Sequence, residues 1–375
     1  MAWVVLGALL LGVGVLVSSG CGSSTTTTTQ PPAAPTTVVP TGDTGTTAAT
    51  TASTAAPKEV NIGYNYATSA VNAMQEMALG ATSAAEHSPG VNFNQASPGA
   101  PDVPKQVALL QTTANTSKDG IAIQSLQPDL LARPAQDIGA KGIPLVAVDA
   151  PIPNIDLVIS NSNYDLGVMV AEAILKELLP NAKGEIVMGV AVPGLSVLEQ
   201  RVKGMEETIK KAQPGITFAG PYDTHMTPTE AYAAWSEIVK AHPNALAYMW
   251  PGSADSAALA DIQRQTGKKL LAAGCDLEDK GLQGIKDGYI LALGSPEHWM
   301  KGFIATQLLI NHAQQGAELP KGWWNTGSLL VTKDNVDEIM VRQKDNNSRY
   351  DWFKSKVEEQ IANPAKYLGP ISAFN

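Results

Sequence analysis

From Glu59 onward, short apolar runs alternate with segments in which apolar residues recur every three or four positions. The runs typical of strands are residues 60–64, 91–93, 120–123 and 143–148. Between them, Met74, Met77, Ala78 and Ala81 have helical spacing. Asp102 ahead of residues 105–110 predicts a capped helix. This alternation predicts a parallel sheet with helices on both faces.

A second set of alternating elements begins near Asn163. Its predicted strands are residues 185–190, 216–218, 245–249, 269–273 and 289–293. Its predicted helices are residues 196–212, 228–241, 254–266, 278–286 and 300–312. Two such sets predict an α/β fold with two doubly wound, Rossmann-like lobes. Ligands bind at the carboxyl ends of the strands of such sheets, so we expect a pocket between the lobes.

The N-terminal segment has a different pattern. A run of about 15 residues, mostly apolar, from Trp3 to Val17 precedes small residues and Cys21. This order is typical of a signal peptide (1–20) that ends at a lipid-attachment cysteine. The alternative is a membrane-spanning segment before an ordinary cysteine, but the run is shorter than the ~20 residues that a span needs. Residues 21–57 are rich in Thr, Ala and Pro, and we expect a lipidated, disordered tether that holds the exported protein on the outer face of the membrane.

Composition and motifs exclude several classes of function. There are 26 Lys and Arg against 35 Asp and Glu, without a basic run, so nucleic-acid binding is not expected. The sequence has no glycine-rich phosphate loop, no hydrolase elbow and no metal-ligand spacing among its five histidines. We therefore expect a binding protein without cofactor or metal rather than an enzyme. Cys275, at a predicted strand end, is expected to be a small buried thiol without a disulfide partner.

Ordered segments along residues 59–340 resemble a known family. Residues 104–107 (PKQV) and 118–123 (KDGIAI) are similar to its "KQ…GVDAIII" stretch, and residues 141–149 (KGIPLVAVD) to its "AGIPVVTVD" strand. Residues 272–276 (AAGCD) and 285–288 (IKDG) are similar to its "VVGFD" and "IKDG". In this order, the segments resemble the exported sugar-binding proteins of ABC importers, of the ribose-binding, periplasmic binding protein type I kind.

The resemblance implies two lobes that are joined by three crossings and close on a small ligand. The crossings are expected near residues 160–163, 295–297 and 322–327. The first lobe would then comprise residues 59–161 plus 296–322, and the second lobe residues 162–295 plus 325–340. Residues 341–375 form a C-terminal extension, in which we expect an amphipathic helix packed back on the body.

The implied function is capture of a monosaccharide or polyol by a monomer, which delivers it to a membrane permease with a cytoplasmic ATPase. Two alternatives remain open from the sequence. One is a receptor subunit that senses the ligand for a signalling system. The other is a binder of a nucleoside or another small polar solute.

Polar side chains at strand ends suit a sugar, because amide and carboxylate groups can each bond adjacent hydroxyls. The resemblance points to Asp149 in the first lobe and Asp276 in the second as ligand carboxylates, with turn formation as the alternative. The other candidate ligand-binding residues are Asn65, Asn72, Gln124, Asn161, Asn163, Glu199, Trp250, Glu297, His298 and Trp299.

Each of these candidates has a structural alternative. The asparagines could cap helices or hold the hinge backbone. Trp250 and Trp299 could stack on the C–H face of a sugar or pack between helices. Glu199 stands where ribose binders carry an arginine, which indicates a ligand other than ribose. Arg201 is expected to anchor its helix through an ion pair.

Overall fold

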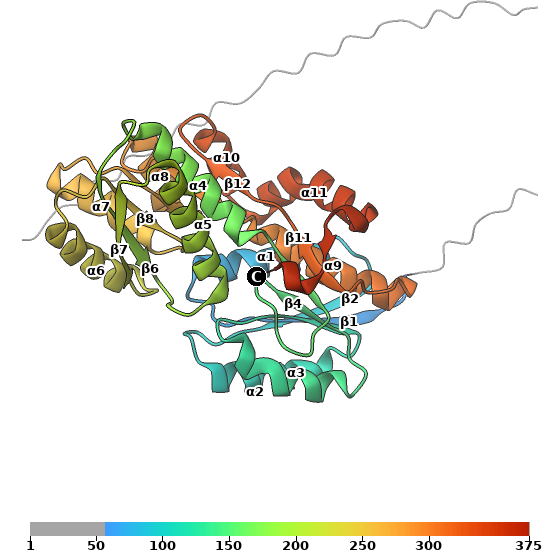
Figure 1. Cartoon of the computed structure of the whole chain (residues 1–375). Coiled ribbons are helices and arrows are strands. Elements are labelled where there is room, and N and C mark those ends of the chain that lie inside the picture. The colour runs from blue at the N-terminus through green and yellow to red at the C-terminus, as the bar shows by residue number, and fades with distance from the viewer. Residues whose placement is uncertain (1–56, 375) are drawn as a thin grey trace, which may run out of the picture. The chain divides into compact units, whose positions relative to one another are not determined.

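Two α/β lobes build residues 57–374, the part of the chain that this computed structural model describes (Figure 1). The predicted signal peptide, Cys21 and all of the predicted tether except Pro57 lie outside the described residues. Among residues 57–374, no helix is both long and apolar enough to cross a membrane.

The first lobe is built on a seven-stranded sheet with the order β13-β11-β5-β4-β3-β1-β2. Neighbouring strands are parallel except β13, which is antiparallel to β11. The strands are β1 (Val60–Asn65), β2 (Val91–Ala96), β3 (Gly120–Gln124), β4 (Leu145–Val148), β5 (Leu157–Ser160), β11 (Gly322–Asn325) and β13 (Leu368–Gly369). Helices α1 (Asn72–Glu86) and α9 (His298–Gln315) cover one face of the sheet. Helices α2 (Val103–Thr116) and α3 (Ala132–Gly139) cover the other face.

The second lobe is built on a six-stranded sheet with the order β12-β10-β9-β8-β6-β7, in which only β12 is antiparallel. Its strands are β6 (Gly184–Val190), β7 (Ile216–Asp223), β8 (Ala247–Trp250), β9 (Ala272–Cys275), β10 (Ala292–Ser295) and β12 (Leu329–Val331). Helices α4 (Asn163–Glu177) and α5 (Ser196–Ala212) pack on one face. The other face carries α6 (Pro228–Ala241), α7 (Asp255–Thr266) and α8 (Asp279–Asp287), with α10 (Val336–Arg342) against α8.

The predicted fold class is confirmed. Helices α5 and α6 begin and end at the predicted residues, and four-residue strands β9 and β10 begin three residues later than predicted. Left-handed glycines end the preceding helices, at Gly267 and Gly288, and residues 268–271 and 289–291 connect these helices to the strands. Cys275 is buried without a disulfide, as predicted, and burial raises the pKa of its thiol to about 12.

The end of the first lobe differs from the prediction. Strand β11 pairs with β5 in the first sheet, so this lobe continues to Asn325 rather than ending at residue 322. The chain later returns to the first lobe through α11 (Asn346–Ala362), which packs on α9 and α1, and through β13. Phe353 and Val357 bury the apolar side of α11, which confirms the predicted amphipathic helix. Short helical turns η1 (Pro128–Leu131), η2 (Pro364–Lys366) and η3 (Ile371–Ala373) complete the described chain.

Glycines allow one very close helix crossing in each lobe. In the first lobe, a Cβ atom on Gly302 of α9 would lie 1.8 Å from the carbonyl oxygen of Met77 in α1. In the second lobe, a Cβ atom on Gly204 of α5 would lie 2.2 Å from the carbonyl oxygen of Tyr164 in α4. Only glycine permits such contacts, so these two crossings fix the positions of α9 and α5, which carry charged side chains into the site described below.

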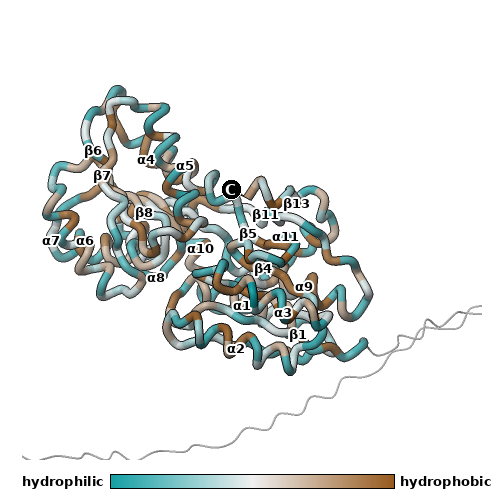
Figure 2. The backbone as a smooth tube through the Cα atoms, turned by 60° about the horizontal axis from the view of Figure 1, so that its bottom comes forward, coloured by the Kyte–Doolittle hydropathy of each residue, from teal (hydrophilic) through white to brown (hydrophobic). Residues whose placement is uncertain are grey.

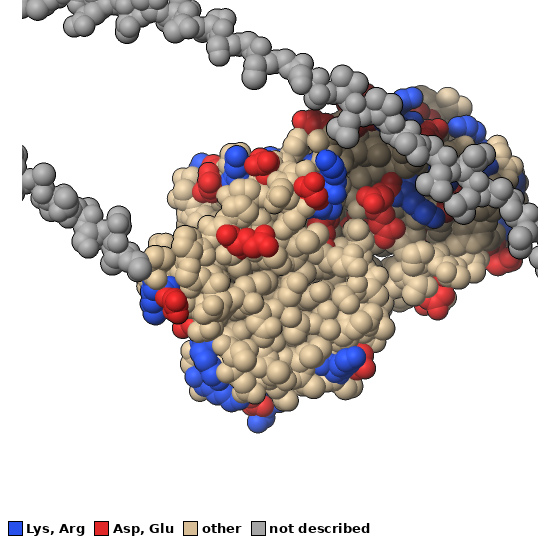
Figure 3. Space-filling model, turned by 180° about the vertical axis from the view of Figure 1, so that it is seen from behind, with Lys and Arg blue, Asp and Glu red and all other residues tan. Residues whose placement is uncertain are grey.

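Hydropathy and charge are distributed as the composition predicts. Apolar and polar stretches alternate along the chain in Figure 2, as amphipathic helices and buried strands require. On the face seen in Figure 3, basic and acidic side chains are interspersed, and no continuous basic area is present. This face therefore offers no stripe for a phosphate backbone.

Candidate ligand-binding site between the lobes

Asp149 and Asp276 occupy equivalent positions in the two lobes. Asp149 follows β4 and Asp276 follows β9, and both have a φ angle of 72°. Each backbone amide donates a 2.8 Å hydrogen bond to the neighbouring strand, Asp149 to the carbonyl of Ile159 and Asp276 to that of Gly294. Aspartate tolerates this left-handed conformation better than most residues.

Each carboxylate is paired with a buried cation of its own lobe. Lys301 of α9 donates a 2.5 Å hydrogen bond to Oδ1 of Asp149. Arg201 of α5 donates a 3.0 Å hydrogen bond to Oδ1 of Asp276, and its Nε donates to Asn163. Ser253 donates to the other oxygen of Asp276. The four charged side chains are almost entirely buried, so each pair neutralises charge that burial alone would disfavour.

These contacts keep both carboxylates ionised. Burial would raise the pKa of Asp276, but Arg201 and His298 outweigh it and hold this pKa well below its usual value. Burial would likewise raise the pKa of Asp149, and Lys301 and His298 lower it below the ordinary value. The site therefore presents two carboxylates as permanent hydrogen-bond acceptors.

His298, at the start of α9, reaches from the first lobe to the second. Its Nε2 lies 3.2 Å from Oδ1 of Asp276. Its Nδ1 is buried and has no hydrogen-bond partner among the described residues. A buried polar atom without a hydrogen bond costs free energy. A ligand that forms this hydrogen bond would therefore bind more tightly.

Together these side chains line a cavity of about 50 Å³ between the lobes. Its charged and polar lining comprises Asp149, Arg201, Ser253, Asp276 and His298. Gly252 and eleven apolar residues form the rest of the lining. The apolar residues are Val71, Ala73, Met74, Leu126, Ala191, Val192, Leu195, Val197, Leu198, Met226 and Ala254. The cavity has room for about three to five water molecules. A sugar therefore enters only when the lobes separate further.

A family comparison decides the class of protein. The family model described as periplasmic binding protein domain matches residues 62–318. The chain belongs to this family. It is a family of binding proteins, as the sequence predicts for this chain.

Solved structures of other periplasmic binding proteins share the fold. A solute-binding protein of an ABC transporter from Burkholderia graminis, in complex with D-arabinose, is 25% identical, with a TM-score of 0.68 over 74% of this chain and 97% of the other. One from Agrobacterium vitis with bound D-fucose is 21% identical, with the same TM-score and the same coverage of both chains.

A further relative is named for the sugars that it binds. The xylose/arabinose-binding protein of Sulfolobus acidocaldarius is 22% identical over 267 residues, or 65% of this chain. This chain spans 64% of the length of that relative.

Three of the residues predicted from the sequence line the cavity of this periplasmic binding protein: Asp149, Asp276 and His298. Arg201 is confirmed as an ion-paired anchor of its helix, and it lines the cavity as well. Among residues 57–374, no three His, Cys, Asp or Glu side chains come together as a possible metal site.

Several predicted residues lie just behind the cavity. Asn65 and Gln124 hold the strand ends, because Gln106 donates to the side chain of Asn65 and to the carbonyl of Gln124. Asn161 donates to Ser328 and so joins two crossings between the lobes. Asn163 accepts a 2.8 Å hydrogen bond from Arg201. These residues position the site and do not line the cavity.

The remaining predicted residues lie elsewhere. Trp250 is buried against Gly274 in the core of the second lobe. Trp299 stacks between Phe303 and Phe353 in the core of the first lobe. Asn72 starts α1 without lining the cavity, and Glu199 is exposed on α5. Glu297 forms a buried ion pair with Arg342 of α10. Stacking of Trp250 or Trp299 on a ligand would require these rings to leave their cores.

Lys301 and Ser253 also belong to the site but were not predicted from the sequence. Lys301 follows His298 by three residues, which places both side chains on the same face of α9. This spacing was the one feature of the sequence that could have placed Lys301 in the site. A lysine on an apolar helix is otherwise expected to extend to solvent. Ser253 lies in the turn between β8 and α7 and carries no comparable signal.

Proposed function

We propose that this protein is the extracytoplasmic solute-binding component of an ABC importer and captures a sugar or polyol between its lobes. The observation that carries the proposal is the pair of ionised carboxylates, one from each lobe, beside a histidine nitrogen that has no partner within residues 57–374. Hydroxyl groups donate to carboxylates, and they donate to or accept from an imidazole nitrogen according to its tautomer, so a polyhydroxylated molecule can satisfy all three.

Relatives support this class of ligand. Two solved structures of this fold contain D-arabinose and D-fucose, and a third, from Mycobacterium smegmatis, contains glycerol. The ligands of those proteins share adjacent hydroxyl groups. In this chain, Asp149, Asp276 and His298 would contact the ligand, while Lys301 and Arg201 would hold the carboxylates in place.

Binding would shift an equilibrium between separated and closed lobes. A ligand that contacts both Asp149 and Asp276 gains its full set of hydrogen bonds only when the lobes are closed. This difference in affinity is what drives closure. The closed form would then deliver the ligand to the permease, whose ATPase powers transport. The N-terminal segment would keep the protein at the membrane through lipid on Cys21.

A ligand screen tests the proposal. Thermal unfolding would be followed with pentoses, hexoses, polyols and nucleosides, and each hit would be titrated by calorimetry. A ligand at 100 times its dissociation constant should stabilise the protein by ~2.7 kcal/mol. Asp149→Asn should weaken binding by about tenfold or more, which corresponds to ~1.4 kcal/mol.

The matched control is Asp334→Asn, which changes an exposed carboxylate outside the cavity. Unchanged affinity in a folded Asp149→Asn variant would contradict the assigned site. Stabilisation by nucleosides alone would contradict the proposed ligand class. Cys21→Ser tests the anchor separately, because it should release the protein from the membrane fraction.

A further inference from the structure

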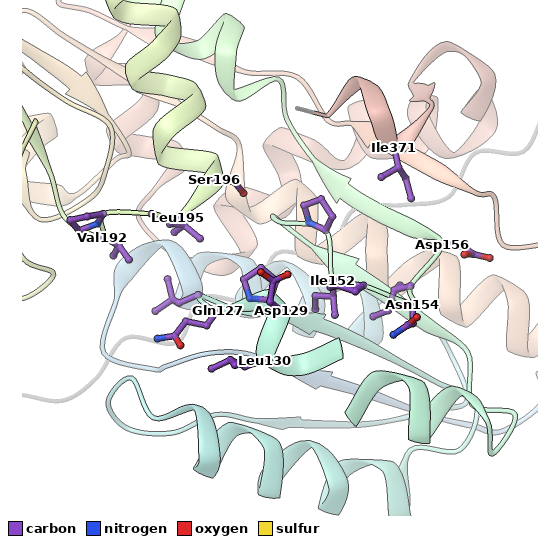
Figure 4. Close-up of a pocket in the computed structure, with 17 residues that line it drawn as sticks. Gln127, Asp129, Leu130, Ile152, Asn154, Asp156, Val192, Leu195, Ser196 and Ile371 are labelled. Atoms are coloured by element: carbon purple, nitrogen blue, oxygen red, sulfur yellow. The ribbon is translucent and has the colours of Figure 1, made fainter. Parts of the chain in front are cut away.

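A groove of about 900 Å³ lies outside the small inner cavity (Figure 4). Its walls come from three loops, residues 126–130 after β3, residues 151–156 between β4 and β5, and residues 192–196 after β6. Ile371 of the C-terminal turn η3 adds a fourth wall. The groove thus draws on both lobes and on the C-terminal extension.

The lining of the groove is largely aliphatic. Eleven of its 17 residues are proline, leucine, isoleucine or valine, and none is aromatic. Leu130 is 57% exposed and Ile371 is 37% exposed, so both leave apolar surface in water. Isolated exposed apolar residues are ordinary, but Leu130 and Ile371 both belong to the lining of one groove. Without aromatic rings the groove lacks a flat platform for a sugar ring and suits a hydrocarbon chain instead.

The groove and the inner cavity share part of their walls. Leu126, Val192 and Leu195 line both of them. The inner cavity holds the charged groups but only about 50 Å³, whereas the groove has the larger space and few charges. A molecule that reached the carboxylates with one end would therefore place its other end among the aliphatic side chains.

We propose that the groove is a subsite for an aliphatic substituent of the ligand. The preferred ligand would be an alkyl glycoside or a similar polyol ether, with its hydroxylated head at Asp149 and Asp276 and its alkyl chain beside Leu130 and Ile371. This inference rests on the proposed function, because it assumes that the head is a sugar or polyol. Ile371 lies beyond residues 62–318, which the family model matches, so this part of the subsite belongs to the extension of this chain.

Calorimetric titration with methyl and hexyl glycosides of D-arabinose and D-glucose tests the inference. For at least one of these sugars, the hexyl glycoside should bind about tenfold or more tightly than the methyl glycoside. Each methylene buried contributes roughly a fourfold gain, and only part of the chain needs to be covered. Leu130→Ser and Ile371→Ser should weaken hexyl binding by about threefold or more and leave methyl binding unchanged.

The matched control is Leu179→Ser, because Leu179 is 78% exposed and lies outside the groove. It should change neither titration, and thermal unfolding would show that all three variants are folded. Equal binding of methyl and hexyl glycosides, or equal weakening of both by the groove variants, would overturn the subsite while leaving the proposed function intact. If neither the glycosides nor the free sugars and polyols bind, this result contradicts both the proposed function and the subsite.

Discussion

The imidazole of His298 lies 3.2 Å from the carboxylate of Asp276, across the boundary between the lobes. His298 begins a helix of the first lobe, whereas Asp276 directly follows a strand of the second. The oxygen that faces His298 also accepts a hydrogen bond from Arg201. This contact must be broken when the lobes separate, so it contributes to the free energy of closure.

Replacing His298 should therefore favour separated lobes. His298→Ala removes the contact with Asp276 but leaves the pair of Asp276 with Arg201 intact. We expect a larger radius of gyration than for the wild type in small-angle X-ray scattering without ligand. His225→Ala is the control, because His225 is exposed between β7 and α6. An unchanged radius of gyration for His298→Ala would show that this contact does not hold the lobes together.

The buried pair of Lys301 and Asp149 predicts a strong coupling in stability. Lys301→Met leaves Asp149 buried without its cation, and Asp149→Asn leaves Lys301 without its anion. Each single change should lower the free energy of unfolding by about 3–5 kcal/mol. The double variant should lose much less than the sum, because it leaves no unpaired charge. Urea denaturation of the four proteins measures this coupling, and additive losses would contradict it.

Asp255, at the start of α7, predicts a pH dependence of stability. Burial raises the pKa of its carboxyl group from 3.8 to about 7. One oxygen accepts a 2.6 Å hydrogen bond from Trp235, and the other has no partner among the described residues. The folded protein holds this proton more tightly than the unfolded chain. Its contribution to stability therefore falls as the pH rises from about 4 to about 7.

Asp255→Asn should remove this dependence, since the amide cannot ionise and can still accept the bond from Trp235. The variant should gain stability relative to the wild type as the pH rises from 5 to 8, by at most about 3 kcal/mol. Chemical denaturation at several pH values measures the difference. Asp334→Asn should show no such trend, and a difference that shrinks with rising pH would contradict the assignment.

The close crossing of α4 and α5 predicts that Gly204 is essential for the site. Gly204→Ala would force a Cβ atom to within 2.2 Å of the Tyr164 carbonyl, so α5 must move away. Because α5 carries Arg201, the pair with Asp276 should weaken together with the fold. We expect a loss of a few kcal/mol in unfolding free energy. Gly139→Ala is the matched control, because its Cβ would meet nothing within 4 Å and stability should hold or rise. Equal stability of the two variants would contradict the close crossing.

The sequence predicted the two lobes well, because strand runs and helical spacing are local properties of the chain. It also predicted equivalent strand-end positions for Asp149 and Asp276, since carboxyl ends of parallel strands meet at one edge of a sheet. Strands β5 and β11 were missed. The two strands pair with each other across 165 residues (Gly322 with Leu157), which no local pattern indicates.

The sequence could not predict whether the side chains of Trp250 and Trp299 face the core or the cavity. All four residues of β8 are buried, so no alternation distinguishes the side of Trp250. Trp299 packs on Phe353 of α11, which lies outside the part of the chain that resembles the family. Lys301 was missed because its burial depends on a partner that is 152 residues away.

The return of α11 and β13 to the first lobe has a consequence for biosynthesis. Strands β6 to β10 and helices α4 to α8 are contiguous in the chain, so nearly all of the second lobe can assemble soon after it leaves the ribosome. The first sheet lacks the strands of one edge, β11 and β13, until residues 322–369 emerge. The half that is translated first is thus the half that matures last.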